Sequence, residues 1–459
     1  MKLIVGFAVP LLAGLVFQQF YNMMDTIIVG KYLGVKQLAG VGATGALNFL
    51  VLGFCTGTCC GFSIPVAQSF GAGDEHMLRK YVANAIWLSV IFAVAVTLTV
   101  CLLCRKILGW MDTPEDIFEY SYSYIFVIFL GIPAIILYNL VSGIIRSLGD
   151  SKTPVYFLVI AACLNIAFDL IAILGFHTGV EGAAGATVLA QLISGLLCVF
   201  YMRKNYPILR FEKDELHFDR KCAGVLCNMG MPMGLQYSVT AIGSVTLQTA
   251  VNGLGSGAVA AVTAAGRINS LCCCPLDALG STMATYSGQN VGARKLGRVK
   301  EGLHSAAFLG TCYALLALGV MYFFGRNLLL LFLDTSDLQV FNNARQMQMT
   351  NAAFLILLTL IYLFRFSIQG MGYSKLAVIA GVFELFARVF VAMVLVPAFG
   401  FTGVCFANPI AWLMADVFLI PAFGYAFRKI GRQIGMPEEP EKQKQTVRFR
   451  AFRLHPGRG

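Results

Sequence analysis

Twelve long apolar runs, separated by short polar segments, constrain this chain more than any other feature of its sequence. A helix needs about 20 mainly apolar residues to cross the hydrocarbon core of a bilayer. The runs are 3–30, 37–70, 81–104, 120–145, 154–176, 182–202, 221–254, 257–292, 302–324, 346–369, 376–398 and 401–427. Only 12% of the residues are charged, against roughly 25% in soluble domains. We therefore predict an all-α polytopic membrane protein with twelve transmembrane helices.

The distribution of Lys and Arg predicts the orientation of these helices. If the N-terminus is cytoplasmic, 25 of these residues lie in cytoplasmic segments and 6 in outside loops. Such an excess is typical of the cytoplasmic side. We predict a multi-pass protein of the bacterial cytoplasmic (inner) membrane with both termini cytoplasmic. The first run is longer than the core of a signal peptide and is predicted to be a spanning helix.

Short motifs recur at one nearly constant distance along the chain. The pairs are Ala43–Asn48 with Ala264–Asn269, Gln68–Ala72 with Gln289–Ala293, Gly149–Lys152 with Gly372–Lys375, and Gly179–Gly182 with Gly400–Gly403. Because each half holds an even number of spans, the repeats are parallel, and an axis along the membrane normal relates them. We predict an N-lobe (1–202), a cytoplasmic linker (203–220), a C-lobe (221–428) and a basic cytoplasmic tail (429–459). A substrate path is expected between two six-helix bundles.

Acidic residues within the spans are candidates for function, because a charge in the bilayer is costly. They are Asp25, Asp169, Asp277, Glu384 and Asp416. Topology predicts that Asp25 and Asp169 meet, since each lies near the outer end of its span.

Three polar residues are expected beside this carboxylate pair. Tyr21 and Asn165 lie four residues before Asp25 and Asp169, on the same helix face, and Thr187 enters span 6 at the same depth. Two carboxylates in a poorly solvated pocket cannot easily both be ionised, which suits proton exchange. The alternative interpretation is a structural pair that neighbouring polar side chains satisfy.

Several motifs resemble those of multidrug and toxic compound extrusion (MATE) transporters. They are Gln19-Phe20-Tyr21-Asn22-Met23-Met24-Asp25, Ala67-Gln68 with Gly71-Ala72-Gly73, Arg146-Ser147-Leu148-Gly149-Asp150, and Gln369-Gly370-Met371-Gly372. The resemblance covers nearly all of residues 3–428. It implies two six-helix lobes and the export of amphipathic organic compounds by antiport against inward H⁺ or Na⁺ flow, with alternating access.

The resemblance is to the DinF-like branch of the family, and it implies roles for individual residues. Positions corresponding to Asp25 and Asp169 hold the ionisable carboxylates of an N-lobe cation site. Asn165 and Thr187 offer further oxygen ligands, so Na⁺ and H⁺ both stay open as the coupling ion. A proline fifteen residues before the first Asp is a bending point in that family. Pro10 is therefore either a hinge or a static kink.

The C-terminal half lacks the acids that NorM-type members of the family carry in spans 7 and 10. It has instead Arg267, Arg365, Glu384 and Arg388. Glu384 and Arg388 are four residues apart and are predicted to form a structural pair. Asp277 is expected to line the central cleft or to pair with Arg267. Asp416 has no obvious partner.

Other classes of function find little support in the sequence. The five His lie in or beside loops, and no G-x-x-x-x-G-K-[ST] motif occurs, so we predict no enzyme, no ATP hydrolysis, no cofactor and no metal beyond Na⁺. We expect a monomer in the bilayer with no nucleic-acid partner. A lipid-linked oligosaccharide flippase is the alternative, because Arg in the C-terminal half would suit a pyrophosphate. A second alternative is a twelve-span facilitator of another fold.

Overall fold

The structure is a computed structural model, which describes residues 1–111, 113–212, 214–333 and 338–435. Within these ranges the chain is helical and contains no strand. The described part has nine helices that are long and apolar enough to span a membrane, or eleven when each of two bent pairs counts as one span. The twelfth spanning helix is α9, which is long but less apolar. The predicted all-α fold with twelve transmembrane helices in two bundles is confirmed.

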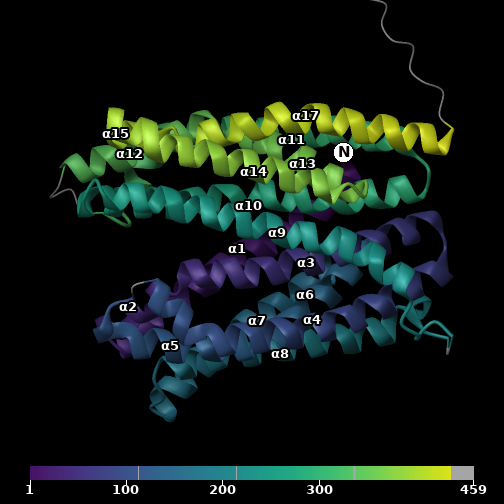
Figure 1. The fold of residues 1–459 in the computed structure, drawn as a ribbon, viewed down its shortest axis with the longest axis horizontal. Coiled ribbons are helices and arrows are strands. Elements are labelled where there is room, and N and C mark those ends of the chain that lie inside the picture. Colours follow the sequence, from purple (N-terminus) through teal and green to yellow (C-terminus); the bar gives the residue numbers. More distant parts are fainter. Residues whose placement is uncertain (112, 213, 334–337, 436–459) are drawn as a thin grey trace, which may run out of the picture.

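The N-terminal bundle, called here the N-lobe, contains the first eight α-helices. They are α1 (Lys2–Tyr32), α2 (Val35–Ala43), α3 (Gly45–Ala72), α4 (Glu75–Trp110), α5 (Glu115–Leu130), α6 (Ile132–Ser147), α7 (Lys152–Leu170) with the π-helical turn η1 (Ile171–Gly175), and α8 (Val180–Asn205). In Figure 1, α2 and α4 to α8 form one layer of the molecule.

The C-terminal bundle, called here the C-lobe, follows a linker that contains the short 3-10 helix η2 (Pro207–Leu209). Its elements are α9 (Arg220–Asn252), α10 (Ser256–Gly292), α11 (Leu296–Leu329), α12 (Leu338–Ala353), α13 (Leu355–Gly370), α14 (Ser374–Phe390), the π-helical turn η3 (Val391–Leu395), α15 (Val396–Phe399), α16 (Phe401–Cys405) and α17 (Ala407–Ile434). Helices α11 to α17 form the second layer, and α1, α3, α9 and α10 lie between the two (Figure 1).

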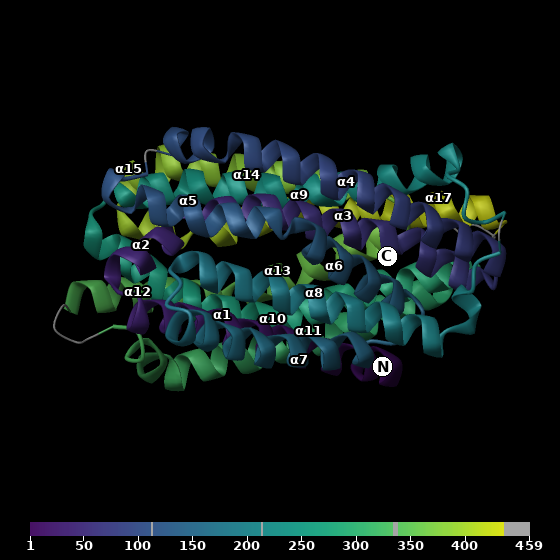
Figure 2. The same ribbon diagram turned by 90° about the horizontal axis from the view of Figure 1, so that it is seen from below.

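Several predicted spans are interrupted, and one of them, 401–427, divides at Phe406 into α16 and α17. The run 37–70 is two helices, because the chain turns at the buried Thr44, whose hydroxyl bonds to the Val41 carbonyl. Helices α5 and α6 meet at 46° beside Gly131, where Pro133 removes one ladder hydrogen bond. Helices α12 and α13 meet at 49°, although no proline marks Phe354. The long run 257–292 is the continuous helix α10, and Figure 2 shows the spans aligned along the long axis.

Helix α9 is less apolar because it packs between the lobes, where small residues allow close approach. A Cβ at Gly61 of α3 would lie 2.4 Å from the Gly230 Cα of α9, and a Cβ at Gly57 would lie 2.7 Å from the Met233 carbonyl oxygen. Only glycine fits such contacts. The lobes therefore meet along a tightly packed α3–α9 seam.

The predicted domain boundaries stay a prediction. Helix α17 continues to Ile434, past the predicted start of the basic tail. Most of that tail, residues 436–459, lies outside the described residues.

Candidate functional site

A polar cluster inside the N-lobe contains the residues that the sequence analysis selected. Helix α1 supplies Tyr21 and Asp25, α7 supplies Asn165 and Asp169, and α8 supplies Thr187. The carboxyl groups of Asp25 and Asp169 are in contact with each other. The Asn165 Nδ2 donates a hydrogen bond of 3.1 Å to the Thr187 Oγ1. The structure thus brings together side chains from helices that are far apart in sequence.

Several oxygen atoms in this cluster are buried without a hydrogen-bond partner among the described residues. They are Asp25 Oδ1, Asn165 Oδ1, Asp169 Oδ1, Asp169 Oδ2 and Gln191 Oε1. Asp169 has no exposed surface, and Asn165 is 2% exposed. Buried acceptors without donors are costly, so the cluster favours a bound proton or cation. Its carboxylate, amide and hydroxyl oxygens are also the ligands that hard cations prefer.

Three residues extend this cluster beyond the sequence prediction. The Tyr21 hydroxyl interacts with the side chains of Gln18 and Gln191, and the buried Tyr124 of α5 interacts with the carboxylate pair. Gln191 lies four residues after Thr187, so helix spacing could have identified it. Nothing in the sequence distinguished Tyr124, because its helix packs there only through tertiary contacts.

The backbone beside Asp169 is irregular. Helix α7 changes to the π-helical turn η1 at Ile171, directly after Asp169 and Leu170. Single π turns inside α-helices often occur at functional sites. An equivalent turn, η3, follows α14 in the C-lobe, so the duplication preserved this irregularity.

Helix α1 runs unbroken through Pro10. It packs on α7 of its own lobe and on α10 of the other. Its buried residue Ile4 belongs to the hydrophobic core of the C-lobe. A change in the shape of α1 would therefore act on both lobes.

The predicted Glu384–Arg388 pair forms in the C-lobe, and Glu384 has a second, closer partner. Glu384 contacts Arg365 of the neighbouring helix α13, while the Arg388 Nη2 lies 3.9 Å from its carboxylate. The predicted Glu384–Arg388 pair is therefore only the weaker contact, because Arg365 approaches the carboxylate directly across the α13–α14 interface.

Asp277 and Arg267 do not pair. Asp277 interacts with the Tyr362 hydroxyl, and Arg267 is exposed. Side chains ten residues apart on one helix lie about 80° apart around its axis and nearly three turns apart along it, so these two residues cannot pair.

A cavity of about 50 Å³ lies between the lobes. It is lined by residues of α3, α6, α9, α10 and α13, among them Cys60, Ser63, Arg146, Ser281 and Phe366. Its position matches the predicted substrate path between the bundles.

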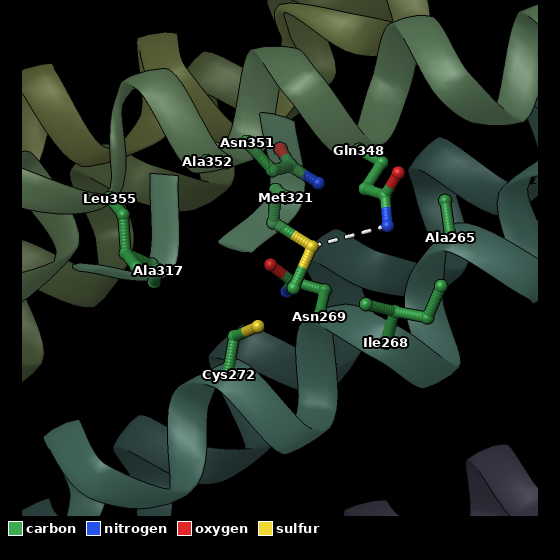
Figure 3. A pocket seen from close by; sticks show the side chains of 10 residues that line it. All are labelled: Ala265, Ile268, Asn269, Cys272, Ala317, Met321, Gln348, Asn351, Ala352 and Leu355. Carbon is green, nitrogen blue, oxygen red and sulfur yellow. Dashed lines mark hydrogen bonds between the residues drawn. The ribbon is translucent and has the colours of Figure 1, made fainter. Parts of the chain in front are cut away.

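A second cavity, inside the C-lobe, has a volume of only about 10 Å³. Figure 3 shows Asn269, Met321, Gln348 and Asn351 around it, with the Gln348 amide 3.2 Å from the Met321 sulfur. A volume of about 10–15 Å³ holds one water, so this cavity is too small for an organic substrate.

Two duplicated glutamines connect the lobes at the predicted cytoplasmic ends of α3 and α10. The Gln68 Nε2 donates to the Gly370 carbonyl at 2.9 Å, and the Gln289 Nε2 donates to the Ser147 carbonyl at 2.8 Å. A Cβ at Gly292 would lie 1.9 Å from the Gln68 carbonyl oxygen. We call these two hydrogen bonds the glutamine clamp.

The linker between the lobes is fixed to α4 by a buried carboxylate. The Arg79 Nε lies 2.9 and 2.7 Å from the two Glu215 oxygens, and the His76 Nδ1 lies 2.9 Å from one of them. The hydrogen bond from Arg79 lowers the pKa of Glu215 from 4.5 to about 2. The linker is thus attached to the N-lobe.

The fold and these polar sites define a multi-span membrane protein with two six-helix lobes. A family model described as MatE matches residues 10–171 and 232–394, one segment in each lobe. The chain therefore belongs to the MatE family.

Relatives and solved structures agree with this assignment. "Probable multidrug resistance protein YoeA" of Bacillus subtilis is 29% identical over 338 residues, which cover 72% of this chain and 73% of that protein. A "FAD transporter" of Shewanella oneidensis is 22% identical and covers 66% and 68%. A structure titled "Outward-facing conformation of a multidrug resistance MATE family transporter of the MOP superfamily" superposes with a TM-score of 0.85 at 23% identity, covering 94% of this chain and 96% of that one.

Proposed function

We propose that this chain is a secondary active exporter of small, amphipathic organic compounds, driven by inward flow of H⁺ or Na⁺. The observation that carries this proposal is the contact between Asp25 and Asp169 among buried acceptors that lack donors. Relatives named as multidrug resistance proteins support export of foreign compounds.

The carboxylate pair is the proposed coupling site. Like charges in contact oppose joint ionisation. The pair is therefore stable with one bound cation and unstable when both carboxylates are ionised and no cation is bound. A proton bound between the two oxygens, or Na⁺ held by Asp25, Asn165, Asp169 and Thr187, would satisfy the unpaired acceptors. Pro10 is the proposed bending point that transmits the exchange along α1.

Alternating access is proposed to open and close the glutamine clamp. Its bonds join α3 to α13 and α10 to α6, so they exist only while the cytoplasmic ends of the lobes are together. A cytoplasm-open state must break both. The cavity beside Cys60 and Arg146 would then widen into the substrate path.

The excess of Lys and Arg in one set of loops supports the orientation proposed for this transporter. We propose a monomer in the cytoplasmic membrane, with both termini and the linker on the cytoplasmic side. The flippase alternative is not favoured, because Arg365 and Arg388 are buried beside Glu384 and are not free for a pyrophosphate.

Transport into proteoliposomes tests the proposal. The probes are ethidium and, because one relative is named for FAD, a flavin dinucleotide; pH and Na⁺ gradients are imposed separately. We expect one gradient to drive uphill movement of a probe, and expect Asp25→Asn and Asp169→Asn each to abolish it. Gradient-driven transport at the wild-type rate in both variants would refute the assigned coupling site.

A further inference from the structure

The C-lobe contains a second buried cluster of ionisable groups, on helices other than those of the carboxylate pair. Its members are Arg365 of α13, Glu384 and Arg388 of α14, and Asp416 of α17. Each is at most 8% exposed. When all four are ionised, the charges of this cluster cancel. Such a cluster is tolerated in a membrane only when its charges are well paired.

The pairing within this cluster is uneven. Glu384 contacts Arg365 and also lies 3.9 Å from Arg388, whose Nη1 donates to the Thr240 carbonyl at 3.3 Å. Asp416 is 3% exposed, and both of its oxygens lack a hydrogen-bond partner among the described residues. The Arg365 Nε is likewise a buried donor without an acceptor there. One carboxylate thus has two cations, while the other has none in contact.

Only one of the charged groups that interact with Asp416 is a donor, and it lies on a helix that packs on α17. The charged groups that interact with it are Arg365, on α13, and Glu384, on α14. Helices α11, α12 and α16 also touch α17, but no charged group on their described residues interacts with Asp416. An ionised Asp416 carboxylate that is buried from water and accepts no hydrogen bond is unfavourable. The carboxyl must hold a proton or take a hydrogen bond from Arg365.

We propose that Asp416 is a second proton-binding site, and that its carboxylate and Glu384 compete for Arg365. With the proton on Asp416, Arg365 stays on Glu384, as in this structure. When the proton leaves to water, the Asp416 carboxylate attracts the guanidinium and Glu384 keeps Arg388. No bond other than the O–H of Asp416 forms or breaks.

This exchange can reach the interface between the lobes through packed helices. Helix α17 packs on α13 and α14, α14 packs on α9, and α9 packs on α3 of the N-lobe. Next to Arg365, the Gln369 amide donates to the Gln236 Oε1 at 2.7 Å and so connects α13 to α9. Gly370, one residue further on, accepts the hydrogen bond from Gln68 in the glutamine clamp. A movement of Arg365 therefore acts on the helix that carries one acceptor of the clamp, five residues away.

The inference rests on the proposed function, and two experiments separate their failures. In proteoliposomes, Asp416→Asn fixes the residue in its neutral form. We expect it to reduce pH-driven ethidium transport at least about tenfold, in the usual range of coupling between sites. Asp416→Glu should preserve the response to the pH gradient. Glu119→Gln, an exposed acid paired with Arg105, controls for the change from acid to amide.

The second experiment is a structure of the Glu384→Gln variant, which does not depend on transport. With only one carboxylate left, Arg365 should bond to Asp416. The inference is overturned if Asp416→Asn responds to the pH gradient as the wild type does. It is also overturned if Arg365 stays beside residue 384 in the structure of the Glu384→Gln variant. If no gradient drives transport in the wild type, the proposed function fails, and the Glu384→Gln structure alone decides the competition for Arg365.

Discussion

Removing the glutamine clamp should shift the protein towards a cytoplasm-open state. The double variant Gln68→Ala with Gln289→Ala loses one hydrogen bond of 2.9 Å and one of 2.8 Å between the lobes. Each such bond contributes a net of about 0.5–1.5 kcal/mol. Their joint loss of about 1–3 kcal/mol corresponds to an increase of about 5- to 150-fold in the open-to-closed ratio.

Cys60 provides a native reporter for this shift. It is only partly exposed and lines the cavity between the lobes. Its labelling by a membrane-impermeant thiol reagent, applied to inside-out vesicles and quantified by peptide mass spectrometry, should accelerate by the same factor. The buried Cys55 and Cys59 of the same helix serve as internal references.

A matched control lies next to Gln289. The Asn290 Nδ2 donates to the Tyr286 carbonyl within α10 itself, at 2.8 Å. Asn290→Ala therefore removes an amide of similar burial without removing a contact between lobes. An unchanged Cys60 rate in the double variant, or an equal increase in Asn290→Ala, would refute the clamp as a cytoplasmic gate.

Three further predictions concern other contacts. Gly61→Val should lower the thermal midpoint of unfolding in detergent far more than Gly42→Val, because a Cβ at Gly61 would lie 2.4 Å from the Gly230 Cα and one at Gly42 would meet no atom within 4 Å. Because folding lowers the pKa of Glu215 from 4.5 to about 2, its contribution to stability is complete above pH 4.5 and is lost as the pH falls towards 2. The difference in melting temperature between wild type and Glu215→Gln should therefore shrink over that range, and a constant difference would contradict this assignment. Thr187→Val should weaken Na⁺-driven transport more than pH-driven transport, because it removes one oxygen ligand and leaves both carboxylates; equal losses under the two gradients would argue against Na⁺ coordination by Thr187.

The sequence predicted the features that depend on periodicity and topology. Apolar runs identified the spans, and counting them placed Asp25 and Asp169 at one depth, where their carboxyl groups are in contact. Helix spacing selected Tyr21 and Asn165 correctly as their neighbours. These predictions succeeded because local order along a helix, together with alternating direction across a membrane, fixes depth without knowledge of packing.

The remaining features depend on contacts between helices, which spacing cannot identify. Helix spacing predicted the Glu384–Arg388 pair, which forms, but it could not identify the closer partner Arg365, nineteen residues away on the adjacent helix. The apolar run that predicted a single span has no proline or glycine beside Phe354, so nothing in that run indicated the break there. The repeated Gln68 and Gln289 were visible as a motif, but their role appeared only when their acceptors in the opposite lobe were known.

The internal duplication separates mechanical features from chemical ones. Features preserved in both halves are Gln68 with Gln289, Gly71 with Gly292, and the π-helical turns after α7 and α14; the first two pairs form contacts between the lobes. The ionisable groups are not preserved, because Thr246 and Phe390 stand 221 residues after Asp25 and Asp169. A symmetric gate needs matching halves, since each lobe must release the other at the same moment. A coupling site has no such requirement, because one bound cation suffices to change the balance between two states. The C-lobe can therefore carry the proposed cluster around Asp416 and Arg365 in place of a carboxylate pair and still open through the same glutamines.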